Sequence, residues 1–190
     1  MATAATNSWQ VTQAANRLLD GEVLAYPTES VWGLGCDPEN KEATLRLLQI
    51  KDRPVTKGLI LVAGSIDQIA ELLYPLSPSE RKRILATWPG PTTWLVPDLN
   101  DVIPPWIKGC HDSVAVRVSA HPLVAALCQQ FGGPLVSTSA NKAGKHPART
   151  SLQVVKQLGR DIDGLLHGRL GDSERPSRII DLLSGQVLRG

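Results

Sequence analysis

Short apolar runs and amphipathic stretches alternate along this chain. Apolar runs that end at proline, glycine or polar residues predict buried strands, at residues 23–26, 59–63, 94–96, 113–118 and 135–137. Apolar residues three or four positions apart predict helices, over residues 12–19, 40–50, 65–73, 121–131 and 150–158, with another beginning at 77. Loops are predicted at residues 28–37 and 141–149, and a terminal hairpin at 178–181 and 186–189.

Residues that can cap a helix stand at most of the predicted helix starts. Thr12, Asn40 and Thr150 can each accept a hydrogen bond from a backbone N–H of the first turn. Ser65 and Ser77 each precede a glutamine or glutamate by three positions, which is the spacing of a capping box. These signals support the helix boundaries that the periodicity predicts.

The regular alternation of strands and helices predicts an α/β domain built on a mixed sheet. The chain has 190 residues, of which 42% are hydrophobic and 20% charged, and this composition is typical of one globular domain. We expect that domain to span residues 7–190. Several polar segments follow predicted strands, and strand ends are where α/β sheets usually bind ligands.

Charge and cysteine content exclude several classes of protein. The net charge is only +2, so any basic surface must be local. Cys36, Cys110 and Cys128 are odd in number and widely spaced, which argues against a disulfide framework and a zinc site. Residues 1–9 do not resemble a signal peptide, and no run approaches the ~18 apolar residues of a membrane span. We therefore expect a cytoplasmic protein without a membrane partner.

Three cations, Lys51, Arg53 and Lys57, lie within seven positions at the end of a predicted helix. Such a cluster can neutralise a polyphosphate. It can equally be a solvated helix end, because most charge runs are exposed. The segment has no P-loop pattern, and the glycines of residues 31–35 do not form a dinucleotide-binding motif.

Hydroxyl and amide side chains follow the predicted strand 135–137. The segment 137–141 reads Ser-Thr-Ser-Ala-Asn and could orient a small polar substrate, or could satisfy backbone groups of its own loop. Arg117 shares a strand face with Ser113, although a lone strand arginine is usually exposed or paired. No pattern around the four histidines, or around any serine or cysteine, predicts a covalent nucleophile.

Taken together, these segments resemble the YrdC/TsaC family of threonylcarbamoyl-AMP synthases over nearly the whole chain. The matching segments, in chain order, are 27–35 (PTESVWGLG), 51–54 (KDRP), 88–93 (WPGPTT), 114–117 (VAVR), 139–141 (SAN), 176–181 (PSRIID) and 188–190 (LRG). The family usually has tyrosine where Trp32 stands. The ordered set is highly specific, although each segment alone is weak.

The resemblance implies a fold and a reaction. The family has an open, twisted, mixed sheet with flanking helices and a deep, positively lined cavity. It condenses L-threonine, bicarbonate or carbon dioxide, and ATP into threonylcarbamoyl-adenylate and pyrophosphate. The adenylate then passes to tRNA threonylcarbamoyl-transferase proteins, which modify the adenosine beside the anticodon in tRNAs that read codons starting with A. Mg²⁺ is expected with ATP, without a dedicated protein site.

The resemblance also implies roles for individual residues. Lys51 and Arg53 are the expected catalytic residues. The expected ATP-binding residues are Lys51, Arg53, Lys57, Ser113, Ser137, Asn141 and Arg189, and the expected threonine-binding residues are Thr28, Arg117, Ser139 and Ser177. The chain departs from the family at Lys142-Ala143-Gly144, where x-Ser-Gly is common, and at Arg178, where threonine often follows serine.

Two other functions fit some of the same features. A cation-lined cavity could bind the backbone of tRNA or double-stranded RNA, so an RNA-maturation factor without synthase activity is the main alternative. The low net charge and the lack of an aromatic RNA-binding motif rank it second. A carbamoyl-transferring domain, as in hydrogenase-maturation proteins, is third, because the appended domains of those proteins are missing from this sequence.

Overall fold

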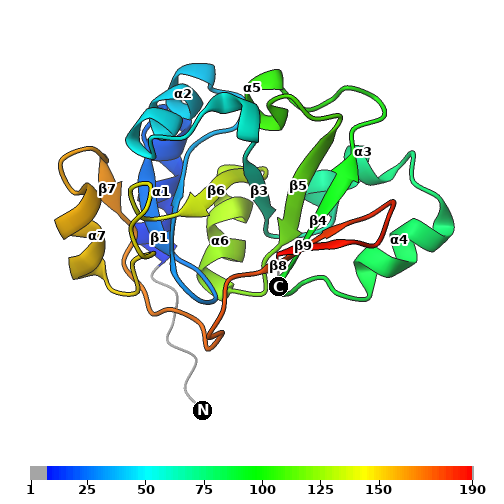
Figure 1. The fold of residues 1–190 in the computed structure, drawn as a ribbon. Coiled ribbons are helices and arrows are strands. Elements are labelled where there is room, and N and C mark those ends of the chain that lie inside the picture. Colours follow the sequence, from blue (N-terminus) through cyan, green and yellow to red (C-terminus); the bar gives the residue numbers. More distant parts are fainter. Residues whose placement is uncertain (1–7, 190) are drawn as a thin grey trace, which may run out of the picture.

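A nine-stranded mixed sheet forms the centre of the structure, a computed structural model that describes residues 8–189 (Figure 1). Residue 7 and Gly190, at the ends of the predicted domain, lie outside that range. The strands are ordered β7-β1-β2-β6-β3-β5-β4-β8-β9 across the sheet. Their bounds are β1 Leu24–Pro27, β2 Trp32–Gly35, β3 Ile60–Ala63, β4 Thr92–Pro97, β5 Ser113–Val118, β6 Leu135–Ser139, β7 Gly164–Leu165, β8 Arg178–Asp181 and β9 Val187–Arg189.

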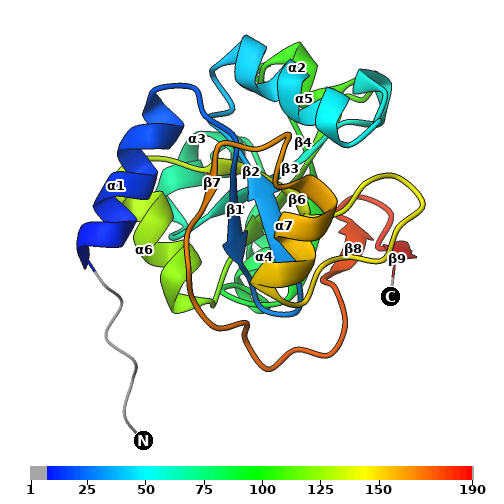
Figure 2. The ribbon, with the colours of Figure 1, turned by 90° about the vertical axis from the view of Figure 1, so that its left-hand side faces the viewer.

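Helices cover both faces of this sheet, and Figure 2 shows α1 and α6 side by side. The helices are α1 Ser8–Leu19, α2 Lys41–Ile50, α3 Ala70–Leu73, α4 Pro78–Leu85, α5 Pro105–Lys108, α6 Pro122–Phe131 and α7 Ser151–Leu158, with 3-10 turns η1 Val55–Lys57 and η2 Asp67–Ile69. Within residues 8–189, none is long and apolar enough to cross a membrane. The predicted α/β class with an open mixed sheet and flanking helices is confirmed.

Alternate strand residues divide between two hydrophobic cores. Leu24 and Tyr26 of β1 pack in one core with α1 and α6, whereas Ala25 belongs to the other core. The same division separates Leu135 from Val136 in β6. A period of two with both faces buried explains why these strands appear in the sequence as continuous apolar runs.

Three of the predicted helix caps are confirmed. Asn40 accepts a hydrogen bond from the backbone N–H of Ala43 (3.0 Å), and Thr150 caps α7 in the same way. Ser77 and Glu80 form a reciprocal capping box at the start of α4. The predicted hairpin is also confirmed, since β8 pairs with β9 in antiparallel fashion.

The prediction of a loop over residues 28–37 is wrong, because β2 lies within it and pairs with β1 and β6. The glycines that indicated a loop instead permit close packing in the sheet. A Cβ atom at Gly35 would lie 2.3 Å from the carbonyl oxygen of Val136 and 2.7 Å from the hydroxyl of Tyr26. A glycine at such a close approach of backbones is compatible with a strand.

Two predicted helix starts are also wrong. Thr12 lies inside α1, which begins at Ser8, and its hydroxyl donates to the carbonyl of Ser8. The predicted helix 65–73 is a 3-10 turn followed by the single helical turn α3. Gln68 does not close a capping box, because its amide bonds to Gly64 N and to the carbonyl of Cys128.

Candidate active site

A cavity of about 480 Å³ opens where η1, α5 and the central strands meet the terminal hairpin. Within the described residues, its lining includes no aspartate or glutamate. It does include five side chains that carry a positive charge, from Arg53, Lys57, Lys108, Arg117 and Arg189. A concave site with one sign of charge attracts anionic ligands.

The sheet places the hydroxyl-bearing side chains along this cavity. Ser113 and Arg117 of β5 both line it, as their shared strand face predicts. β6 lies on the other side of β3 and contributes Ser137, Thr138 and Ser139. The register that pairs Ile60 with both Ala115 and Ser137 thus brings two distant segments to one site.

Arg53 and Lys57 are the two members of the predicted cation cluster that line the cavity. The guanidinium of Arg53 donates to the carbonyl of Gly58 from Nη2 (2.8 Å) and Nε (3.1 Å), and to the carbonyl of Lys57 (3.2 Å). Burial lowers the pKa of Arg53 from its usual value. Arg53 therefore supports the turn that carries Lys57 as well as facing the cavity.

Lys51 and Asn141 are absent from the described lining, although both are predicted ATP ligands. The ammonium of Lys51 donates to the carbonyls of Ser139 and Asn141 (2.6 Å for the latter) and to Oδ1 of Asn141 (3.0 Å). Burial lowers the pKa of Lys51 to about 8, and the charge of Arg53 acts in the same direction. The geometry makes Lys51 a brace between α2 and the loop after β6.

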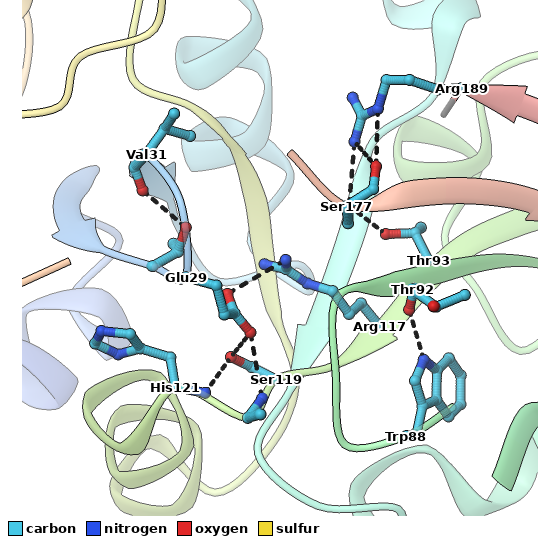
Figure 3. A network of polar contacts seen from close by, with 12 residues as sticks. Glu29, Val31, Trp88, Thr92, Thr93, Arg117, Ser119, His121, Ser177 and Arg189 are labelled. Carbon is cyan, nitrogen blue, oxygen red and sulfur yellow. Dashed lines mark hydrogen bonds and ion pairs between the residues drawn. The ribbon is translucent and has the colours of Figure 1, made fainter. Parts of the chain in front are cut away.

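Arg117 forms a buried ion pair with Glu29 (Figure 3). Nη1 of Arg117 lies 3.3 Å from Oε2 of Glu29. The other carboxylate oxygen accepts hydrogen bonds from Ser119 Oγ (2.7 Å) and Ala120 N (3.2 Å). Burial alone would raise the pKa of Glu29, but Arg117 and Ser119 together hold that pKa below its usual value.

The remaining predicted residues, Thr28, Ser177 and Arg189, also line the cavity. Arg189 donates from Nε (3.0 Å) and Nη2 (2.8 Å) to the carbonyl of Ser177, and the hydroxyl of Ser177 lies 2.8 Å from that of Thr93 (Figure 3). Thr28 donates its hydroxyl proton to the carbonyl of Val31 (2.7 Å). The structure thus gathers nine of the eleven predicted binding residues at one cavity.

Lys108 and His111 also line the cavity, and the sequence analysis missed both. Lys108 forms an ion pair with Asp98 (2.8 Å) and another with Asp101. A backbone hydrogen bond from Leu59 N to the carbonyl of Ile107 (2.8 Å) holds α5 beside the cation cluster. This contact joins segments about fifty residues apart, and no local spacing could have indicated it.

Residues 8–189 contain no group of three or more His, Cys, Asp or Glu side chains placed to hold a metal ion. The described cavity lining contains cationic side chains but no carboxylate groups. Any magnesium ion bound here would take its oxygen ligands mainly from a polyphosphate and water.

Comparison with known proteins identifies the relatives of this chain. A family model for the Sua5/YciO/YrdC domain, described as "Telomere recombination", matches residues 16–190. The chain belongs to this family. It is 52% identical over 180 residues to the threonylcarbamoyl-AMP synthase of Marinobacter nauticus, covering 95% of both chains. It is 53% identical over 183 residues to that of Pseudomonas paraeruginosa, covering 96% of this chain and 98% of the relative.

Solved structures of the Sua5/YciO/YrdC family share the fold. Sua5 from P. abyssi in complex with L-threonine superposes with a TM-score of 0.87 at 29% identity, covering 95% of this chain and 53% of that one. YciO from E. coli superposes with a TM-score of 0.85 at 24% identity, covering 96% of this chain and 89% of that one. This chain therefore spans about half of the Sua5 chain and most of YciO.

Proposed function

We propose that this chain is a threonylcarbamoyl-AMP synthase, which condenses L-threonine, bicarbonate or carbon dioxide, and ATP into threonylcarbamoyl-adenylate and pyrophosphate. The cavity of five cations without an acidic side chain carries the proposal, because both the triphosphate and the amino-acid carboxylate are anions. Relatives of about 50% identity that span nearly the full chain bear this name.

The reaction has two chemical steps. The amine of threonine attacks carbon dioxide and loses a proton, which gives a carbamate. A carboxylate oxygen of that carbamate then attacks the α-phosphorus of ATP, and pyrophosphate leaves. No covalent enzyme intermediate is required, so catalysis depends on alignment of the two substrates and on neutralising the charge of the leaving group.

The lining offers groups that suit each substrate. Arg53, Lys57 and Lys108 suit the phosphates, and α5 packs against η1, which brings Lys108 near Lys57. Arg117 has a planar guanidinium that can pair with the threonine carboxylate, and Thr28, Ser139 and Ser177 offer hydroxyls nearby. Ser113, Ser137 and Arg189 complete the proposed nucleotide contacts. Lys51 and Asn141 contribute through the loop that they brace.

When bound with ATP, Mg²⁺ would neutralise phosphate oxygens and favour departure of pyrophosphate. We further propose that the adenylate supplies the threonylcarbamoylation of the adenosine beside the anticodon in tRNAs reading codons that start with A. The transfer would be completed by tRNA threonylcarbamoyl-transferase proteins in the cytoplasm. Binding of tRNA by this chain stays a prediction of the sequence.

Pyrophosphate release tests the proposed function directly. Purified protein should release pyrophosphate from ATP when threonine and bicarbonate are both supplied, and omission of either should abolish release. Mass spectrometry should detect threonylcarbamoyl-adenylate in the complete mixture. ATP turnover that ignores threonine, or no turnover at all, would overturn the proposal and favour the RNA-binding alternative.

A further inference from the structure

Glu29 lies behind the cavity wall rather than in it. It is 7% exposed and absent from the described lining, whereas its partner Arg117 is 8% exposed and lines the cavity. The segment after β7 covers Glu29, because Gly171 N and Ser173 N donate to the carbonyls of Thr28 and Glu29. Glu29 is therefore a buried acid whose side chain reaches the site only through Arg117.

The carboxylate of Glu29 is held on one side and directed at Arg117 on the other. Oε1 accepts two hydrogen bonds, from Ser119 Oγ and Ala120 N, in the turn that directly follows β5. Oε2 accepts no hydrogen bond of good geometry within residues 8–189, and the guanidinium of Arg117 is its ion-pair partner at 3.3 Å. Figure 3 shows the carboxylate between the turn and the guanidinium.

Arg117 keeps hydrogen-bonding capacity in this pair. Its Nε is buried and has no partner within the described residues. A guanidinium has five N–H donors in a fixed plane, and Glu29 contacts the group at Nη1. Because Nε is buried, the donors left for a second anion are those of the Nη groups, and Arg117 lines the cavity.

We propose that Glu29 is a positioning residue, which fixes the guanidinium of Arg117 where it binds the threonine carboxylate. The inference rests on the proposed function, in which Arg117 binds the substrate carboxylate. One cavity must bind two different anions, and a free arginine would turn toward the more highly charged triphosphate. A buried acid dedicated to Arg117 prevents that movement and keeps a separate site for the amino acid.

The surroundings of Glu29 support a fixed orientation. His121 lies at the start of α6, where its backbone N–H bonds to Ser119 Oγ and its Nε2 lies 3.1 Å from the carbonyl of Arg169. Burial lowers the pKa of His121, so near neutral pH its ring adds no competing charge. Arg117 is then the charged partner that the described structure offers to Glu29.

Substitution of Glu29 by glutamine tests the inference, with threonine and ATP binding each measured by calorimetry. The Oε1 atom of glutamine can keep the bonds from Ser119 and Ala120, but its NH₂ group would then face the guanidinium, donor against donor. Glu29→Gln should weaken threonine binding by about tenfold or more and leave ATP binding unchanged. The matched control is Glu71→Gln, which neutralises an exposed acid on α3.

A double-mutant cycle separates positioning from a general structural effect. If Glu29 acts through Arg117, then Glu29→Gln should add almost nothing to the loss of threonine binding in Arg117→Lys. Glu29→Asp keeps the charge and should recover part of the affinity. If Glu29→Gln does not fold, Ser119→Ala takes its place, because it removes a bond that anchors the carboxylate; weaker threonine binding is expected there too.

These measurements distinguish failure of the inference about Glu29 from failure of the proposed function. An unmutated protein that binds no threonine overturns that function, and the inference with it. With threonine binding intact in the unmutated protein, normal threonine affinity in a folded Glu29→Gln overturns the inference alone. Equal losses for threonine and ATP, or full additivity with Arg117→Lys, would likewise show that Glu29 does not position Arg117.

Discussion

Lys51 donates a hydrogen bond from its ammonium to the side-chain oxygen of Asn141 over 3.0 Å. The pair links the C-terminal end of α2 to the loop after β6, and the same ammonium bonds to two backbone carbonyls of that loop. Ser139 Oγ also donates to Asn141 Oδ1 (2.6 Å), so the brace reaches a side chain that lines the cavity. Lys51 and Asn141, which belong to two separate sequence motifs, are thus joined by direct contact.

Replacement of Lys51 by alanine should lower stability as well as activity. The substitution removes a charged donor from the half-buried carbonyls of Ser139 and Asn141, a loss of about 1–3 kcal/mol. Urea unfolding measures the change, and Lys57→Ala, which removes an exposed lysine, is the control. Equal stability of the two variants would contradict the bracing role of Lys51.

Replacement of Lys57 by alanine should weaken ATP binding without loss of stability. Lys57 lines the cavity and is an exposed residue, so removal of its side chain disturbs no buried group. A charged hydrogen bond contributes about 1.5–3 kcal/mol, which corresponds to a rise of roughly tenfold to a hundredfold in the KM for ATP. Lys156→Ala, on the exposed face of α7, is the matched control for charge.

Arg53→Ala should show the same kinetic defect together with lower stability, because Arg53 also supports Gly58.

Much of this site could be predicted because short sequence patterns determine it. A strand period of two places Ser113 and Arg117 on one face, and the structure confirms it. Asn40, Ser77 and Thr150 cap their own helices within one turn, so a local pattern was enough to locate them. Thr12 and Ser65 match the same pattern but cap no helix. The family motifs indicated the remaining candidate residues, because the order of these motifs along the chain is specific.

What could not be predicted depends on contacts between distant segments. The direction of the Lys51 side chain depends on where the loop after β6 lies, about ninety residues later. Lys108 joins the site because α5 packs against η1, which no local pattern specifies. Gly35 is needed because Val136 of β6 and Tyr26 approach it closely. Neither residue is adjacent to Gly35 in the sequence, so the glycine by itself indicates only a loop.

Lys108 should bind phosphate, and its acidic partner Asp101 should compete with that binding. Asp98 is buried and anchored by Val102 N and Ile103 N, whereas the side chain of Asp101 is 87% exposed and can release Lys108 readily. Lys108→Ala should raise the KM for ATP about tenfold, and Asp101→Asn should lower it modestly. An unchanged KM for ATP in Lys108→Ala would show that the Asp98 ion pair is its whole role.

Arg117→Lys should raise the KM for threonine far more than the KM for ATP. Lysine keeps the charge but loses the planar fork that pairs with a carboxylate. The pocket should also prefer threonine over serine by roughly 10–200-fold, since the missing methyl contributes ~1–3 kcal/mol in a fitted site. Steady-state kinetics with each substrate varied in turn provides both values. Equal changes in the two constants would exclude Arg117 as the carboxylate anchor.

Glu29 should make stability depend on pH in the acid range. Its folded pKa lies below the usual 4.5, because Arg117 and Ser119 outweigh the effect of burial. A carboxyl group whose pKa is lowered by folding stabilises the protein fully above pH 4.5, and this contribution is lost as the pH falls through the folded pKa. The free energy of unfolding, measured by urea titration from neutral pH downward, should therefore fall more steeply below pH 4.5 in the unmutated protein than in Glu29→Gln. Glu71→Gln should follow the unmutated curve, because that side chain is exposed. Parallel curves for all three proteins would mean that the Glu29–Arg117 pair adds no stability that depends on ionisation of Glu29.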